Sequence, residues 1–224
     1  MESIQTIVFD IETRPSDTPP SPEDLKPPAQ MKKAETIEKW RSDPANVDKA
    51  HAAEALNPFK GQILTISWIM DNELVRSVTD VDERKVLETF QEQLQDQFRA
   101  RFSGNDHIVQ PTWIAHNIKF DMGFLFLRLL KYDLDWLLRV TGEDPSQIRH
   151  ACTMQTMAVM DKYKTFVSLD VSCRMFGIEG KLSGMDGSKV FPYFKAGKLD
   201  EIDEYCRQDT TATWMLAKKL RLVR

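Results

Sequence analysis

The sequence predicts an α/β domain built on a mixed β-sheet that is flanked by helices. Apolar runs rich in Ile, Val, Thr and Trp, typical of strands, open the chain and return after residue 60. Later stretches repeat apolar residues at helical spacing and alternate with short strand-like runs. The 224 residues are 42% hydrophobic and 29% charged, as in a globular domain. We therefore expect residues 1–224 to form a single domain.

Three strands are expected early in the chain. The first strand is expected at the apolar run Ile4–Ile11, which ends in acids. Because side chains alternate along a strand, Asp10 and Glu12 should emerge on the same face. The next two strands are expected at residues 62–70 and 74–79, joined through Asp71-Asn72-Glu73 as a hairpin turn.

A long amphipathic helix is expected after this hairpin. Asp80 is expected to cap it, with Glu83 three places on as the second member of a capping box. Apolar residues then recur at helical spacing at Val86 or Leu87, Phe90, Leu94 and Phe98.

Four further elements are expected in the second half of the chain. They are a strand at Thr112–Ala115 and helices at Phe120–Lys131, Leu169–Phe176 and Leu199–Arg221. The first of these helices carries Asp121 in its first turn, and Gly177 ends the second. The alternation of helix and strand completes the α/β pattern.

Residues 14–60 differ in composition from the rest of the chain, and we interpret them as an insertion. They hold eight of the eleven prolines, and their eight Lys and Arg balance eight Asp and Glu. Pro15–Pro28 should be an extended connector, and Met31–Trp40 has the composition of a short helix. Two interpretations stay open, a lid or strand guide beside a functional site and a solvated surface loop.

Charge and cysteine content exclude some functional classes. A net charge of −4 argues against a protein that coats nucleic acid non-specifically, although an enzyme that holds only a strand end is compatible. Cys152, Cys173 and Cys206 are odd in number and widely spaced, so we expect buried free thiols rather than disulfides or a zinc site.

The sequence shows neither a signal peptide nor a membrane span. The first ten residues have no basic region before an apolar stretch, and the longest apolar segment, Phe124–Leu130, is interrupted by Arg128. We expect a cytoplasmic protein without a membrane partner.

Four carboxylates and one phenol are the candidate catalytic residues: Asp10, Glu12, Asp121, Asp209 and Tyr205. Like charges gathered in one site repel and resist ionisation unless cations neutralise them. Carboxylate oxygens are the ligands that hard divalent cations prefer, so the four acids predict a site for two ions, Mg²⁺ or Mn²⁺.

Tyr205 and Asp209 are four residues apart in an expected helix and therefore share one face. A tyrosine hydroxyl beside a metal-bound water can orient that water. Its ordinary pKa near 10 makes it a poor general base by itself, so the metal must activate the water.

The chain resembles the DEDD 3′ to 5′ exonucleases, a family with a ribonuclease H-like fold. Three stretches match the family's motifs: Phe9-Asp10-Ile11-Glu12-Thr13, Asn117-Ile118-Lys119-Phe120-Asp121 and Tyr205-x-x-x-Asp209. The segments Lys181–Gly187 and Gly197–Ile202 are similar to stand-alone predicted exonucleases related to the proofreading domain of family B DNA polymerases. The tyrosine subclass is favoured, because the histidine subclass has His at the position of Glu204.

The resemblance implies a role for each matching residue. Asp10, Glu12 and Asp209 would hold the catalytic metal, Asp10 would also face a second metal, and Asp121 would support that metal through water. Tyr205 would position the nucleophile. The substrate would contact Thr13, Asn117, Phe120 and Lys181. One departure from the family is Cys152-Thr153, where relatives often carry Asp-Thr, and it concerns local packing rather than metal binding.

The expected function is removal of nucleotides from a 3′ end, preferably of single-stranded DNA, with release of nucleoside 5′-monophosphates. The expected partners are the nucleic acid 3′ end and a polymerase or replication protein. Two alternatives stay open. One is an RNA 3′ exonuclease, since the sequence does not reveal whether a 2′-hydroxyl is tolerated. The other is a catalytically silent module that binds nucleic acid or a polymerase.

Overall fold

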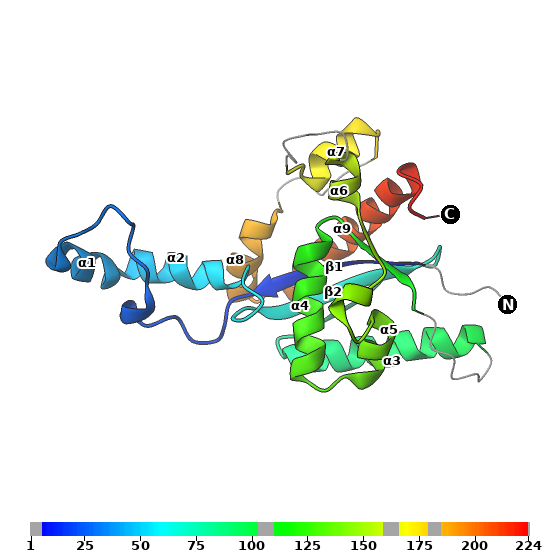
Figure 1. Cartoon of the computed structure of the whole chain (residues 1–224), viewed down its shortest axis with the longest axis horizontal. Helices are drawn as coiled ribbons and strands as arrows, with labels where there is room; N and C mark the ends of the chain where they lie inside the picture. The colour runs from blue at the N-terminus through cyan, green and yellow to red at the C-terminus, as the bar shows by residue number, and fades with distance from the viewer. Residues whose placement is uncertain (1–5, 103–109, 159–165, 179–184, 224) are drawn as a thin grey trace. The chain divides into compact units, whose positions relative to one another are not determined.

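The computed structural model describes residues 6–102, 110–158, 166–178 and 185–223 (Figure 1). The chain divides into two compact units. The sheet unit comprises the chain up to Glu12 and from Ile63 onward, and the insertion unit comprises Thr13–Gln62. The expected insertion is therefore a compact unit of its own.

Five strands form one mixed sheet in the order β3-β2-β1-β4-β5. Their bounds are β1 Thr6–Arg14, β2 Gln62–Met70, β3 Arg76–Thr79, β4 Thr112–Ala115 and β5 His150–Cys152. β2 and β3 are antiparallel, whereas β4 is parallel to both β1 and β5. The Asp71 backbone N–H donates to the Thr6 carbonyl, which places the end of β2 beside the start of β1. The predicted mixed sheet is confirmed.

Seven α-helices are described in the sheet unit (Figure 1). They are α3 Glu83–Phe102, α4 Ile118–Lys131, α5 Asp135–Thr141, α6 Thr153–Met157, α7 Leu169–Met175, α8 Val190–Lys195 and α9 Leu199–Lys219. Short 3-10 turns occur at Pro145–Gln147 and Gly187–Lys189. None of the helices in the described part of the chain combines the length and apolar character needed to cross a bilayer.

The two faces of the sheet pack against different helices, as the side-chain alternation of β1 requires. Ile7, Phe9 and Ile11 enter the main core with α3, α4 and α5. Val8 lies on the other face and packs against Ala217 of α9. Asp10 and Glu12 alternate along β1 in step with Val8, so their side chains emerge on the same face of the sheet. The strand therefore directs both acids toward the face that α9 covers.

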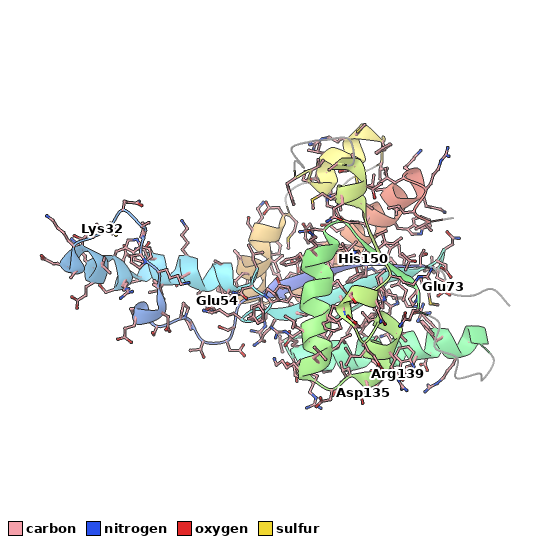
Figure 2. The ribbon with its side chains drawn as sticks, in the orientation of Figure 1. Lys32, Glu54, Glu73, Asp135, Arg139 and His150 are labelled. Atoms are coloured by element: carbon pink, nitrogen blue, oxygen red, sulfur yellow. The ribbon has the colours of Figure 1, made fainter. Side chains whose placement is uncertain are left out.

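Helix α5 shows how the outer surface of the main core is formed. Leu137 and Leu138 are buried, whereas Asp135 and Arg139 are exposed and point away from the sheet (Figure 2). This division between apolar and charged sides is typical of a helix that covers a core.

The predicted long helix is confirmed as α3, and its apolar positions are all buried. The predicted cap is wrong. The Asp82 carboxylate, not that of Asp80, accepts from the Arg84 backbone N–H in the first turn. Glu83 turns inward and accepts from the Ile63 backbone N–H at 2.7 Å. Its side chain is thus used for tertiary structure.

The insertion unit contains two α-helices, α1 Ala34–Arg41 and α2 Pro44–Glu54, and a 3-10 turn at Pro22–Asp24. α1 confirms the short helix expected in this region. α2 was not predicted, although Asp43 caps it by accepting from the Ala45 N–H and Pro44 occupies its first turn. The extended connector expected at residues 15–28 is interrupted by the 3-10 turn.

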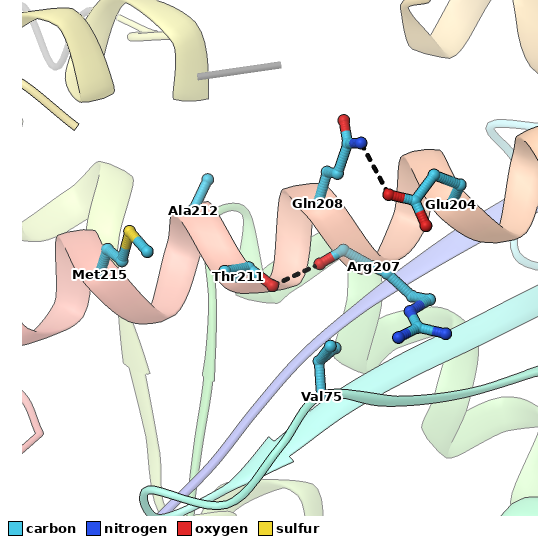
Figure 3. Close-up of a pocket in the computed structure, with 7 residues that line it drawn as sticks. All are labelled: Val75, Glu204, Arg207, Gln208, Thr211, Ala212 and Met215. Carbon is cyan, nitrogen blue, oxygen red and sulfur yellow. Dashed lines mark hydrogen bonds between the residues drawn. The ribbon is translucent and has the colours of Figure 1, made fainter. Parts of the chain in front are cut away.

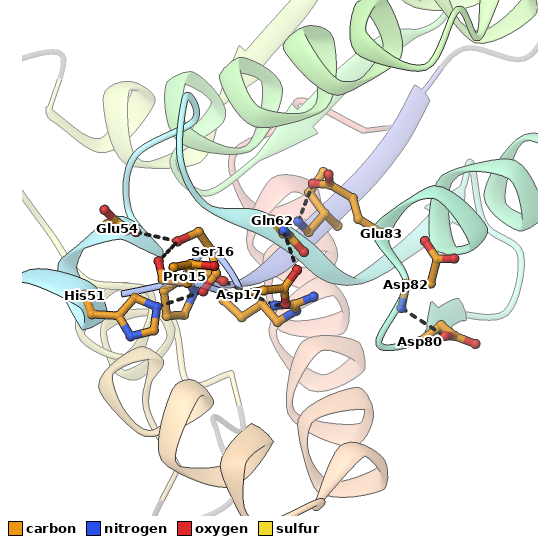
Figure 4. A network of polar contacts seen from close by, with 12 residues as sticks. Pro15, Ser16, Asp17, His51, Glu54, Gln62, Asp80, Asp82 and Glu83 are labelled. Atoms are coloured by element: carbon orange, nitrogen blue, oxygen red, sulfur yellow. Dashed lines mark hydrogen bonds and ion pairs between the residues drawn. The ribbon is translucent and has the colours of Figure 1, made fainter. Parts of the chain in front are cut away.

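Polar contacts around Glu54 connect the segments of the insertion unit (Figure 4). Glu54 is buried; it accepts from Ser16 Oγ at 2.7 Å and pairs with Lys60 Nζ at 2.8 Å. His51 Nε2 lies 2.7 Å from the Ser16 carbonyl oxygen. α1 contributes no buried residue, so this unit relies on hydrogen bonds more than on an apolar core.

Candidate metal centre

Three of the predicted acids converge in the sheet unit. Asp10 and Glu12 of β1 and Asp209 of α9 each offer a carboxylate oxygen, and these oxygens lie within 4.8 Å of one another. Asp209 is buried, with 6% of its surface exposed, and the other two are half-buried. Such a spacing suits oxygen ligands around one divalent cation, so these residues could hold a metal.

Asp121 lies close to this triad but is not part of it. It sits in the first turn of α4 and is 4% exposed. The pKa of the Asp121 carboxyl is raised to about 7, because burial and the negative charge of Asp209 outweigh the hydrogen bonds from the backbone of Asp121 and Ile11. When ionised, the fourth acid therefore adds negative charge beside the three candidate ligands.

The electrostatics of Asp10 fit a cation site. Burial raises the pKa of the Asp10 carboxyl well above its ordinary value, and the charges of Asp121, Glu12 and Asp209 add to that effect in this order. A hydrogen bond from Cys206 acts in the opposite direction. Divalent cations would relieve this repulsion, and four carboxylates are the donor set that Mg²⁺ or Mn²⁺ prefers.

Tyr205 lies one helical turn before Asp209 and is 4% exposed. Its hydroxyl is hydrogen-bonded to the Asp209 side chain. Burial raises the pKa of the Tyr205 phenol far above its ordinary value, and the charges of Glu12 and Asp209 raise it further. The phenol therefore stays protonated and acts as a hydrogen-bond donor rather than as a base.

The predicted substrate-binding residues occupy different surroundings. Asn117 is the N-terminal cap residue of α4, and its carbonyl accepts from the Phe120 N–H. The half-buried Phe120 ring lies 5.0 Å from the Phe124 ring, centroid to centroid. Thr13 belongs to the insertion unit, where its hydroxyl donates to the Ala55 carbonyl at 2.6 Å. Lys181 lies outside the described residues.

The departure from the family pattern at Cys152 has a local structural role. The Cys152 thiol donates to the His116 carbonyl, and its sulfur accepts from the Gln155 N–H as the cap of α6. Cys152, Cys173 and Cys206 are buried thiols outside any disulfide, as predicted.

Sequence reasoning missed a buried polar group under the acids, made of Ser67 on β2 with Cys206 and Thr210 on α9. Two signals were present in the sequence. Ser67 interrupts a strand that is otherwise apolar, and Cys206 lies inside the third motif, one helical turn before Thr210.

A separate pocket lies along another side of α9 (Figure 3). It is lined by Val75, Glu204, Arg207, Gln208, Thr211, Ala212 and Met215. Hydrogen bonds within α9 join Gln208 to Glu204 and Thr211 to the Arg207 carbonyl. Neither Tyr205 nor Asp209 lines this pocket, so it is distinct from the acidic site.

The comparisons with known proteins agree with this fold. Residues 58–224 match the family described as "Predicted 3'-5' exonuclease related to the exonuclease domain of PolB", and the chain belongs to this family. The match includes Asp121, Tyr205 and Asp209 but begins after Asp10 and Glu12. The geometry of the triad joins the first motif, Asp10 and Glu12, to Asp209 of the third.

One solved structure to which the chain is similar is that of the family B DNA polymerase from the hyperthermophilic archaeon Pyrobaculum calidifontis. The TM-score is 0.56 at 15% sequence identity, over 98% of this chain and 25% of the polymerase chain. The ribonuclease H-like fold is thereby confirmed, and the chain spans a quarter of the polymerase's length. A search of curated proteins found no match.

Proposed function

We propose that the protein is a metal-dependent 3′ to 5′ exonuclease that hydrolyses DNA, preferably single-stranded, and releases nucleoside 5′-monophosphates. The observation that carries this proposal is the convergence of Asp10, Glu12 and Asp209 within 4.8 Å, with Tyr205 hydrogen-bonded to Asp209. A chain folded for stability alone would not collect these charges. Membership of an exonuclease family supports the reaction class.

Each residue has a proposed task. Asp10, Glu12 and Asp209 would hold the catalytic cation, Asp10 would also face a second cation, and Asp121 would support that second cation through water. When bound, Mg²⁺ or Mn²⁺ lowers the pKa of the attacking water and offsets the charge that develops on the leaving 3′ oxygen. Tyr205, protonated and fixed by Asp209, orients the water.

The proposed substrate contacts are Thr13, Asn117, Phe120 and Lys181. We also propose a cytoplasmic setting and a separate polymerase or replication partner. The support for that partner is the relation of the family to a polymerase exonuclease domain.

The test is a timed digestion of strands labelled at the 5′ end. Matched single-stranded DNA, double-stranded DNA and RNA are incubated with Mg²⁺, with Mn²⁺ or with a chelator. We expect a ladder of products shortened from the 3′ end, fastest on single-stranded DNA and absent with the chelator.

Two variants complete this test. Asp10→Ala should fold and lose hydrolysis, whereas Asp135→Ala, which removes an exposed acid of α5, should behave as the wild type. Hydrolysis that persists in purified Asp10→Ala would contradict the assignment. A preference for RNA would retain the reaction class and change the substrate.

A further inference from the structure

The Cys206 thiol lies directly under the acidic triad. Cys206 is fully buried on α9, on the helix face that packs against the sheet. Its Sγ is 3.5 Å from Asp10 Oδ2, 3.5 Å from the Asp10 carbonyl oxygen and 3.4 Å from Ser67 Oγ. These distances suit hydrogen bonds to sulfur, so one side chain of α9 contacts a proposed metal ligand of β1.

Ser67 on β2 connects the backbone of Cys206 to the side chain of Thr210. Its hydroxyl donates to the Cys206 carbonyl at 2.9 Å and also contacts the Thr210 hydroxyl. Ser67 has a single hydroxyl hydrogen, and the Cys206 carbonyl accepts it. Thr210 then supplies the hydrogen between the two hydroxyls, and the thiol hydrogen faces three acceptors, which are Asp10 Oδ2, the Asp10 carbonyl oxygen and Ser67 Oγ.

Burial restrains this group of hydrogen-bonded side chains. Ser67, Cys206 and Thr210 are all 0% exposed. Buried polar groups keep their partners because losing one costs about 1–3 kcal/mol. The hydrogen bonds among Ser67, Cys206 and Thr210 therefore fix the register of α9 against β1 and β2. The same register sets the distance between Asp209 and Asp10.

We propose that Cys206 is a positioning residue that orients the Asp10 carboxylate for cation binding, a role that rests on the proposed function. A thiol is a weak donor, so it fixes the direction of one carboxylate oxygen while leaving most of the negative charge for a cation. Partners of this kind, which hold a ligand rather than the metal, tune metal affinity.

The competing explanation is that Cys206 fills space as a small apolar residue. Cys173 supplies the matched control, because it is also buried, at 1% exposure, but packs among apolar residues of α7 and α9. A role in filling space predicts equal effects of alanine at both positions. A positioning role predicts an effect on metal binding at position 206 alone.

The experiment measures Mn²⁺ binding by isothermal titration calorimetry in the absence of nucleic acid, for Cys206→Ala, Cys206→Ser and Cys173→Ala. We expect Cys206→Ala to weaken Mn²⁺ binding by about tenfold, the lower end of the range for such partners. Cys206→Ser keeps a donor and should stay within about threefold of the wild type, a fraction of that loss. Cys173→Ala should match the wild type.

Nuclease kinetics provide a second readout. The Mg²⁺ concentration for half-maximal rate should rise in Cys206→Ala by a similar factor, with the KM for DNA unchanged. Should Cys206→Ala fail to fold, Cys206→Val, which fills the site with an apolar side chain that has no donor, takes its place with the same expected result.

Wild-type Mn²⁺ affinity in the alanine or valine variant would overturn the positioning role while leaving the proposed nuclease intact. Equal weakening in Cys173→Ala would also overturn it. Absence of Mn²⁺ binding to the wild type would instead overturn the proposed function and this inference together.

Discussion

Two acidic groups of the sheet unit, one at Glu83 and one around Asp10, lie in different electrostatic surroundings. Glu83, at 3% exposure, lies 2.7 Å from Arg128 Nε and 3.0 Å from Lys131 Nζ, and accepts from the Tyr132 hydroxyl at 2.8 Å. Around Asp10, in contrast, the charges that raise its pKa are those of three other acids. The first group uses cations of the chain and stabilises the fold. We infer that the second is arranged for cations from solution.

The largest expected effect is on activity at the acidic site. Asp10→Asn keeps the shape of the side chain but removes its charge, and we expect hydrolysis to fall by about a thousandfold or more. Thermal unfolding in chelator should occur at the same or a higher temperature, because one repelling charge is gone. A large fall in the unfolding temperature would show that Asp10 supports the fold instead.

The next effect is on stability at Glu83. Glu83→Ala leaves the buried Arg128 guanidinium without its partner carboxylate, so the free energy of unfolding should fall by about 3–5 kcal/mol. Urea denaturation measures this change. The control is Glu88→Ala on the same helix, where the ion pair with Arg84 is exposed and screened by solvent, so stability should change little. Equal effects of the two variants would contradict the distinction between the sites.

The pH dependence of stability offers a third test. The pKa of Asp121 is about 7 in the fold against an ordinary 3.8, so the folded state binds a proton that the unfolded state has released between these values. Stability of the metal-free protein should therefore rise as pH falls from about 8 to about 5. Asp121→Asn should flatten this slope, as should saturating Mg²⁺. Melting curves in chelator at several pH values measure it, and an identical slope in the variant would contradict the assignment.

The smallest effect is expected at the outer partner of Glu83. Lys131 is 45% exposed in its ion pair, whereas Arg128 is 8% exposed. Lys131→Met should cost under about 1 kcal/mol, as for other exposed pairs. Urea denaturation of Lys131→Met and Glu83→Ala under the same conditions provides the comparison. An equal loss of unfolding free energy in the two variants would show that Lys131, rather than Arg128, is the main partner of Glu83.

Local periodicity was sufficient to predict much of the fold and the site. The alternation of β1 placed Asp10 and Glu12 on one face, and the structure brings both to the side covered by α9. The four-residue spacing of Tyr205 and Asp209 predicted a shared helix face, and the two side chains are hydrogen-bonded. These predictions needed only neighbours in sequence.

What could not be predicted depends on contacts between distant residues. Ser67 and Cys206 are 139 positions apart, and their hydrogen bond follows from the docking of α9 on the sheet. Glu83 has the spacing of a capping box but turns inward because Arg128 and the Ile63 N–H stabilise its carboxylate there. Tertiary contacts outweighed the local pattern in both cases.

The insertion unit has boundaries inside β1 and β2, two hydrogen-bonded neighbours in the sheet. In topological terms it is an enlarged hairpin connection. The entropy lost on closing such a connection grows only with the logarithm of its length, by about 0.6 kcal/mol for each doubling. The entropy cost of lengthening or shortening this connection is therefore small. The distance from Asp10 and Glu12 to β2 does not change with the length of the connection, because the pairing of β1 with β2 fixes it.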